Sequence, residues 1–129
     1  MNLYLLIAGI LCVLLGIAHS ILGEYLIFNN KRNKGSLVPT KVGGELKERH
    51  LRIVWATWHL ASVFGWGIGA ILIKISFLNQ PNTATMDFVL NSIVCTMLFS
   101  SLLVLVGTKG RHPGWVVLFV IGILSVVGN

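Results

Sequence analysis

Four long apolar segments occupy almost the whole of this 129-residue chain. A hydrocarbon core ~30 Å thick is crossed by ~20 apolar residues in a helix that rises ~1.5 Å per residue. The composition agrees, because 55% of the residues are hydrophobic and only 11% are charged. We therefore predict an all-α membrane protein, a four-transmembrane-helix bundle that forms one domain over residues 1–129. The predicted spans are residues 2–28, 51–77, 87–107 and 113–128.

Positive charge is distributed unevenly among the connections between these spans. The first connection, residues 29–50, is a basic loop, and the third contains Lys109 and Arg111. The second connection, residues 78–86, has no lysine or arginine. Because cytoplasmic loops are enriched in Lys and Arg, we expect both termini on the non-cytoplasmic side of a bacterial inner membrane. No nucleic-acid-binding module accompanies the basic residues, so the expected partner is the lipid bilayer.

A histidine lies deep inside each of the first two predicted spans. Ionisable side chains in hydrocarbon are costly and usually face a partner, a cavity or a cofactor. His19 is nine residues from Phe28, which places it ~13 Å from the cytoplasmic side. His59 is eight residues from Leu51, which places it ~12 Å from the same side. Because consecutive spans run antiparallel, we expect the two imidazoles at the same level.

Small and polar residues recur at helical spacing around both histidines. Small residues allow helices to approach closely in lipid, so these stripes are expected to face protein. In the first span the stripe is Gly9, Cys12, Gly16, His19, Ser20 and Gly23. In the second span it is Trp55, His59, Ser62, Trp66 and Gly69.

Two level histidines on facing stripes are suited to bind a metal or to hold a b-type haem through both imidazoles. Glycines beside His19 would leave room for a flat macrocycle, and Ser20 and Ser62 could orient the two rings as hydrogen-bond acceptors. A zinc site is less well supported, because zinc usually takes three or four protein ligands. We therefore predict haem b binding and electron transfer, with cofactor-binding residues His19, His59, Gly16, Gly23 and Ser62. The layout is superficially similar to that of four-helix di-haem cytochromes, although those carry two histidine pairs.

Three alternatives remain open. The histidines can bond serine hydroxyls, such as those of Ser20 and Ser62, as structural links between helices, or line a polar path with Glu24 in an oligomeric transporter or channel subunit. The chain can also be an accessory subunit that docks on a larger membrane complex through its basic loop. Glu24 can pair at the interface with Arg49, Arg52 or His50. No set of nucleophile, base and orienting residue is evident in the sequence, which argues against an enzyme.

The turn between the last two spans carries a further candidate contact. Pro113 suits the first position of a helix, and Trp115 suits the aromatic belt at the membrane interface. Arg111 and His112 would lie beside a helix N-terminus, which favours anions. We therefore predict contact with a lipid phosphate or another anion at Arg111, His112 and Trp115.

Overall fold

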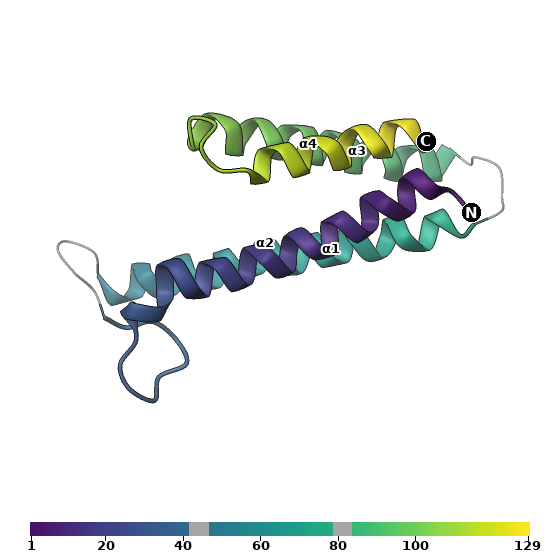
Figure 1. Cartoon of the computed structure of the whole chain (residues 1–129). Coiled ribbons are helices and arrows are strands. Elements are labelled where there is room, and N and C mark those ends of the chain that lie inside the picture. Colours follow the sequence, from purple (N-terminus) through teal and green to yellow (C-terminus); the bar gives the residue numbers. More distant parts are fainter. Residues whose placement is uncertain (42–46, 79–83) are drawn as a thin grey trace.

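The computed structural model is all-helical (Figure 1). It describes residues 1–41, 47–78 and 84–129, so parts of the first and second connections lie outside the described residues. A π-helical turn, Glu24–Phe28, and a 3-10 turn, Asn29–Lys31, extend the first helix. The α-helices are α1 (Leu3–Gly23), α2 (Glu48–Ser76), α3 (Ala84–Gly107) and α4 (Gly114–Val127).

The helices confirm the all-α prediction, and each predicted span boundary lies within three residues of an observed one. Within the described residues, three helical segments are long and apolar enough to cross a membrane: Leu3–Lys31, Glu48–Ser76 and Ala84–Gly107. The fourth predicted span is shorter than expected. Helix α4 has 14 residues, which is ~21 Å of helix against a hydrocarbon core of ~30 Å, so it does not meet the length of a full span.

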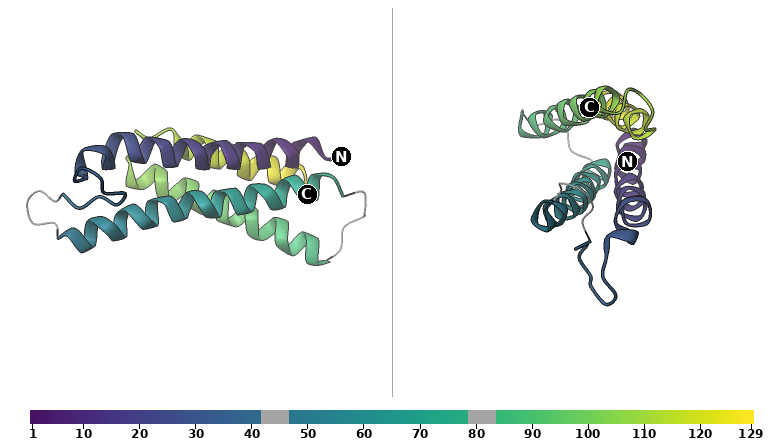
Figure 2. Two further views of the ribbon diagram at one scale, coloured as in Figure 1. Left: turned by 90° about the horizontal axis from the view of Figure 1, so that it is seen from below. Right: turned by 90° about the vertical axis from the view of Figure 1, so that its left-hand side faces the viewer.

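The bundle is open on one side. Helix α1 packs on α2 and on α4, and α4 packs on α3. Seen along the helix axes, the order α2–α1–α4–α3 follows a curve whose two ends, α2 and α3, do not close on each other (Figure 2). Residues on α2 and α3 are therefore free to line a cleft.

The small-residue stripe predicted for the first span faces α2. A Cβ atom added to Gly16 would lie 2.6 Å from Trp66 Nε1 and 3.0 Å from the Ser62 carbonyl oxygen. One added to Gly9 would lie 2.8 Å from the Gly69 carbonyl oxygen. These positions need glycine because the backbones approach each other closely, as small residues allow between helices in lipid.

The hydrophobic core lies in the half of the molecule that holds both chain termini. Asn2 ties this end together, because its side chain accepts a hydrogen bond from Leu5 N at 3.2 Å and donates one to Gly128 O at 2.7 Å. Its backbone N–H donates to Ser76 O at 2.7 Å. Towards the other end, the α1–α2 and α3–α4 hairpins diverge (Figure 1). The core residues are Leu5, Ala8, Cys12, Leu72, Leu90, Ile93, Met97 and Ile121.

Candidate functional site

Three polar side chains meet at the end of the α1–α2 hairpin that carries the basic loop. Ser20 and Glu24 are four residues apart, so they lie on the same side of the first helix. His59 of α2 lies between them. Its Nδ1 atom is 2.9 Å from Ser20 Oγ, and its Nε2 atom is 2.8 Å from Glu24 Oε1.

Glu24 fixes the position of the His59 proton. Its carboxylate accepts a hydrogen bond from Trp55 Nε1 at 2.5 Å and forms an ion pair with Arg32. A carboxylate can only accept hydrogen bonds, so Nε2 of His59 must be the donor to it. Nδ1 of a neutral His59 is then an acceptor, and Ser20 Oγ donates to it.

Ser62 extends this group of residues towards the interior. Its Oγ atom is 3.0 Å from Ser20 Oγ, and its side chain is buried. With a neutral His59, Ser20 donates to the ring and Ser62 donates to Ser20; with a protonated His59, both ring N–H groups donate and Ser20 donates to Ser62. We call Ser62, Ser20, His59, Glu24 and Arg32 the polar network. It satisfies its hydrogen bonds in both protonation states.

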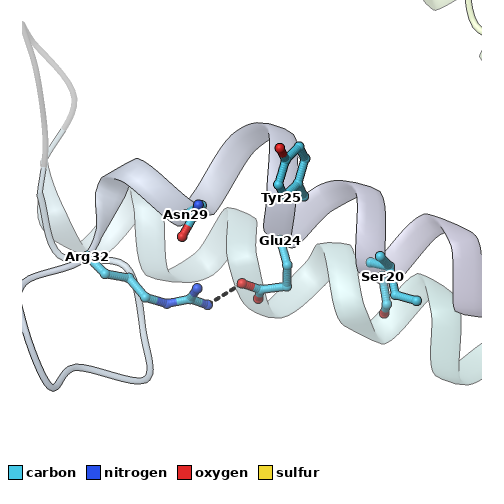
Figure 3. Close-up of a pocket in the computed structure, with 6 residues that line it drawn as sticks. Ser20, Glu24, Tyr25, Asn29 and Arg32 are labelled. Carbon is cyan, nitrogen blue, oxygen red and sulfur yellow. Dashed lines mark ion pairs between the residues drawn. The ribbon is translucent and has the colours of Figure 1, made fainter.

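A pocket of about 400 Å³ opens beside the polar network. Figure 3 shows Glu24 and Arg32 pointing towards each other in this pocket, with Ser20 on the next turn of the same helix. The side chain of Asn29 lies on the same wall (Figure 3). Ser20 and Glu24 both contact His59 and border this open space, and Ser20 is the one of the two that carries a hydroxyl. The lining residues are Ser20, Ile21, Glu24, Tyr25, Asn29 and Arg32.

His19 has different partners from His59. Its ring stacks on Trp58, with ring centroids 4.3 Å apart and an angle of 7° between the planes. The Trp58 indole N–H also donates to the His19 carbonyl oxygen at 2.9 Å. The structure thus places His59 in the polar network, whereas His19 stacks on an indole ring.

The residues predicted to bind haem do not form an open bis-imidazole slot as they are arranged. Both ring nitrogens of His59 already have hydrogen-bond partners. Trp66 and Trp58 occupy the space beside Gly16 and Gly23 that a macrocycle would need. Haem binding by His19 and His59 stays a prediction, and it requires His59 to give up one of its partners. Within the described residues, no group of three or more His, Cys, Asp or Glu side chains is placed to hold a metal ion.

The ion pairs differ from those expected from the sequence. Glu24 pairs with Arg32 from the start of the basic loop, and not with Arg49, Arg52 or His50. Arg52 instead pairs with Glu48 on its own helix, at 3.1 Å. Arg32 also donates to the Leu37 carbonyl oxygen at 2.7 Å, which joins the loop to the network.

A second and larger cavity, of about 680 Å³, lies between α2 and α3. We call it the α2–α3 cleft. It is lined mostly by apolar side chains such as Leu15, Ile68, Phe99 and Leu103. Its polar lining at the end near the α3–α4 turn consists of His19, Thr108 and His112.

One of the three predicted anion-contact residues, His112, lies at that end of the cleft. His112 lines it, and its Nδ1 atom accepts a hydrogen bond from Gly114 N at 3.1 Å. The Trp115 indole N–H donates to the Gly110 carbonyl oxygen at 3.4 Å, which holds the indole against the turn. Arg111 is exposed. Contact of these residues with a lipid or another anion stays a prediction.

The sequence indicated a serine hydroxyl such as Ser20 as a histidine partner, but it did not indicate that Ser20, His59 and Glu24 form one group. Two signals pointed towards it. Ser20 and Glu24 have the spacing of one helical turn, and Ser20 lies eight residues from Phe28, as His59 does from Leu51. That spacing made Ser20 level with His59, but depth alone did not show which way the ring points.

Comparisons with known proteins provide no relative from which a role could be taken. No protein-family model matches the chain, and no curated protein or solved structure matches it.

Proposed function

We propose that this chain is an integral membrane protein that performs acyl transfer or ester hydrolysis at the membrane surface, with Ser20 as the nucleophile. The observation that carries the proposal is the position of His59 between a hydroxyl and a carboxylate, at 2.9 Å and 2.8 Å. A nucleophile, a base in hydrogen-bond reach and a group that orients the base are the signature of activated serine chemistry. The proposed location is the cytoplasmic side of a bacterial inner membrane, and the positive-inside distribution of Lys and Arg supports that side.

Each residue of the network has a defined role in this chemistry. Ser20 Oγ attacks the carbonyl carbon of an ester while its proton moves to His59 Nδ1. The alcohol leaves with that proton, and the acyl group remains on Ser20. Water or another alcohol then attacks the acyl-serine and gives a proton to His59, which passes it to Ser20 Oγ as that oxygen leaves and the acid or a new ester is released. Glu24 holds the ring in the required tautomer and stabilises the imidazolium that forms.

The pocket provides access to Ser20 and a means of stabilising charge. Its volume of about 400 Å³ lies within the range of ~300–1,000 Å³ that is typical of small-molecule sites. The Asn29 amide and the Arg32 guanidinium line it. Side-chain donors of this kind can stabilise the oxyanion of a tetrahedral intermediate. The π-helical turn Glu24–Phe28, which begins four residues after Ser20, is a feature often found at functional sites.

Labelling with a fluorophosphonate probe tests the proposal, because such probes react with activated serines. We expect one labelled site per chain, identified as Ser20 by peptide mass spectrometry, in protein kept in native-like detergent. Ser20→Ala should abolish labelling. His59→Gln should slow labelling by at least tenfold. A general base contributes ~10²–10⁴-fold to the rate, and the polar side chain of glutamine is expected to retain part of that contribution.

Ser101→Ala is the control, because Ser101 is a buried serine outside the polar network that donates to the Trp115 carbonyl oxygen, at 2.8 Å. It should label as the parent protein does. Absence of labelling in the folded parent protein, or equal labelling of Ser20→Ala, would overturn the proposed nucleophile.

A second candidate function is proton transfer along the polar network. Ser62 also lines the α2–α3 cleft, so the bonds from Ser62 through Ser20 and His59 to Glu24 join that cleft to the surface pocket. Chains of Glu and His side chains inside membranes commonly relay protons. In proteoliposomes with an imposed membrane potential, the relay predicts proton entry that Glu24→Gln removes. Fluorophosphonate reactivity at Ser20 without proton flux would favour the first candidate, and the reverse result would favour the relay.

A further inference from the structure

We propose that the α2–α3 cleft binds one anionic phospholipid, with an acyl chain along the cleft and its phosphate at the α3–α4 turn. The cleft is the space left where the two hairpins diverge, and its volume is about 680 Å³. Its walls come from α2 and α3, and its floor comes from α1 and α4. This site is separate from the Ser20 pocket, and the proposal does not depend on what Ser20 does.

The lining of the cleft suits a hydrocarbon chain. Within the membrane-spanning part, the walls are formed by side chains such as Phe64, Phe99 and Leu103. Water in such a space would have few hydrogen-bond partners, so an apolar occupant is favoured. Helices in lipid gain no hydrophobic stabilisation from one another, so a gap between them is filled most readily by the surrounding acyl chains.

The size of the cleft argues against a partner helix as the occupant. A helix ~10 Å wide occupies roughly 420 Å³ for each turn of 5.4 Å. The cleft of about 680 Å³ would therefore hold fewer than two turns, which is much less than a transmembrane segment. A narrow and flexible acyl chain has no such requirement.

The charge at the mouth of the cleft selects an anionic headgroup. Thr108 and His112 line that end, and Lys109 and Arg111 lie in the same turn with exposed side chains. Each Lys or Arg near an anionic lipid surface contributes ~1 kcal/mol of attraction. Thr108, His112 and Gly114 line the cleft from this turn, so a headgroup at the turn and a chain in the cleft can belong to one lipid.

Lys109 has a left-handed backbone conformation that glycine adopts with less strain. Helix α3 ends in a Schellman motif, in which Gly110 N donates to Leu105 O at 2.8 Å and Lys109 N donates to Val106 O at 3.2 Å. The residue at the Lys109 position is left-handed, with φ of 52°, and glycine is the usual residue there. A cation at a strained position is expected where its charge is required.

Native mass spectrometry of the delipidated protein tests the site, with dioleoyl phosphatidylglycerol and dioleoyl phosphatidylcholine as probes. We expect one phosphatidylglycerol per chain to be retained in preference to phosphatidylcholine. Gly65→Leu should abolish retention by filling the cleft, because a Cβ at Gly65 meets only Cys12 O, at 3.7 Å. Gly67→Leu is the matched control on the same helix, since nothing lies within 4 Å of its added Cβ, and it should bind lipid as the parent does.

The headgroup is tested separately from the chain. Lys109→Gln and Arg111→Gln should each weaken the preference for phosphatidylglycerol by about fivefold, which corresponds to ~1 kcal/mol per cation. Inorganic phosphate at millimolar concentration should not displace the lipid. Any one of four results would overturn the proposal. These are equal retention of both lipids, displacement of the lipid by phosphate alone, unchanged lipid binding in Gly65→Leu, and a lipid-free dimer whose formation Gly65→Leu prevents.

Discussion

Removal of the Glu24 carboxylate should destabilise the α1–α2 hairpin far more than removal of a second carboxylate that also pairs with an arginine. Glu24 accepts from Trp55 and His59 and pairs with Arg32. Hydrogen bonds between membrane helices contribute ~0.6 kcal/mol on average and up to ~1.7 kcal/mol. The ion pair adds ~0–1 kcal/mol, because both side chains remain partly exposed. Glu24→Ala should therefore lower the free energy of unfolding by about 1–4 kcal/mol.

The chain offers a matched control and a conservative variant for this measurement. Glu48 pairs with Arg52 at 3.1 Å, but more than half of each side chain is exposed, 51% and 55%. Glu48→Ala should cost at most ~0.5 kcal/mol. Glu24→Gln keeps an oxygen that accepts from Trp55 and His59 and loses mainly the ion pair, so it should cost ~1 kcal/mol. Unfolding in mixed micelles, followed by tryptophan fluorescence, gives the three values. Equal effects of Glu24→Ala and Glu48→Ala would refute the reasoning.

Three further experiments test the packing and the topology. Asn2→Ala should lower the unfolding free energy by about 1–2.5 kcal/mol in the same assay, through a lost helix cap and a lost bond to α4; no loss would mean that the end is held by the core alone. Gly16→Leu should cost ~1–3 kcal/mol by overpacking against Trp66, whereas Gly67→Leu should be tolerated, and equal tolerance would place the stripe towards lipid. In a background without the native cysteines, Gly35→Cys should resist an impermeant thiol reagent added to intact cells and Asn129→Cys should react; the reverse pattern would refute the orientation.

The helices could be predicted from the sequence because hydropathy and length determine a membrane segment almost alone. Segments of ~20 apolar residues give the boundaries of α2, of α3 and of α1 together with its π-helical turn to within three residues. The order of the helices in space could not be predicted in this way. Nearly uniform hydrophobicity around α3 and α4 leaves no apolar stripe that would distinguish a closed bundle from the open order α2–α1–α4–α3.

The partner of His59 in the candidate site could not be predicted either, because the sequence does not show which way a side chain points around the helix axis. His19 and Ser20 are neighbours in sequence, and neighbouring residues point ~100° apart on a helix with 3.6 residues per turn. Their depth is nearly the same, so the level of His59 was equally consistent with either one as its partner. The structure selects Ser20, because Glu24 lies one turn further along on the same side and provides the second bond to the ring.

Trp58 explains why the two histidines end with different partners. Its indole stacks on the ring of His19 and donates to the carbonyl oxygen of the same residue. It also lies against Gly23, where any larger residue would displace it. The glycine that we interpreted as space for a cofactor is therefore space for an indole from the neighbouring helix. Small residues in a membrane helix predict a close approach, but the sequence of that helix alone does not say whether a backbone, an aromatic side chain or a cofactor makes it.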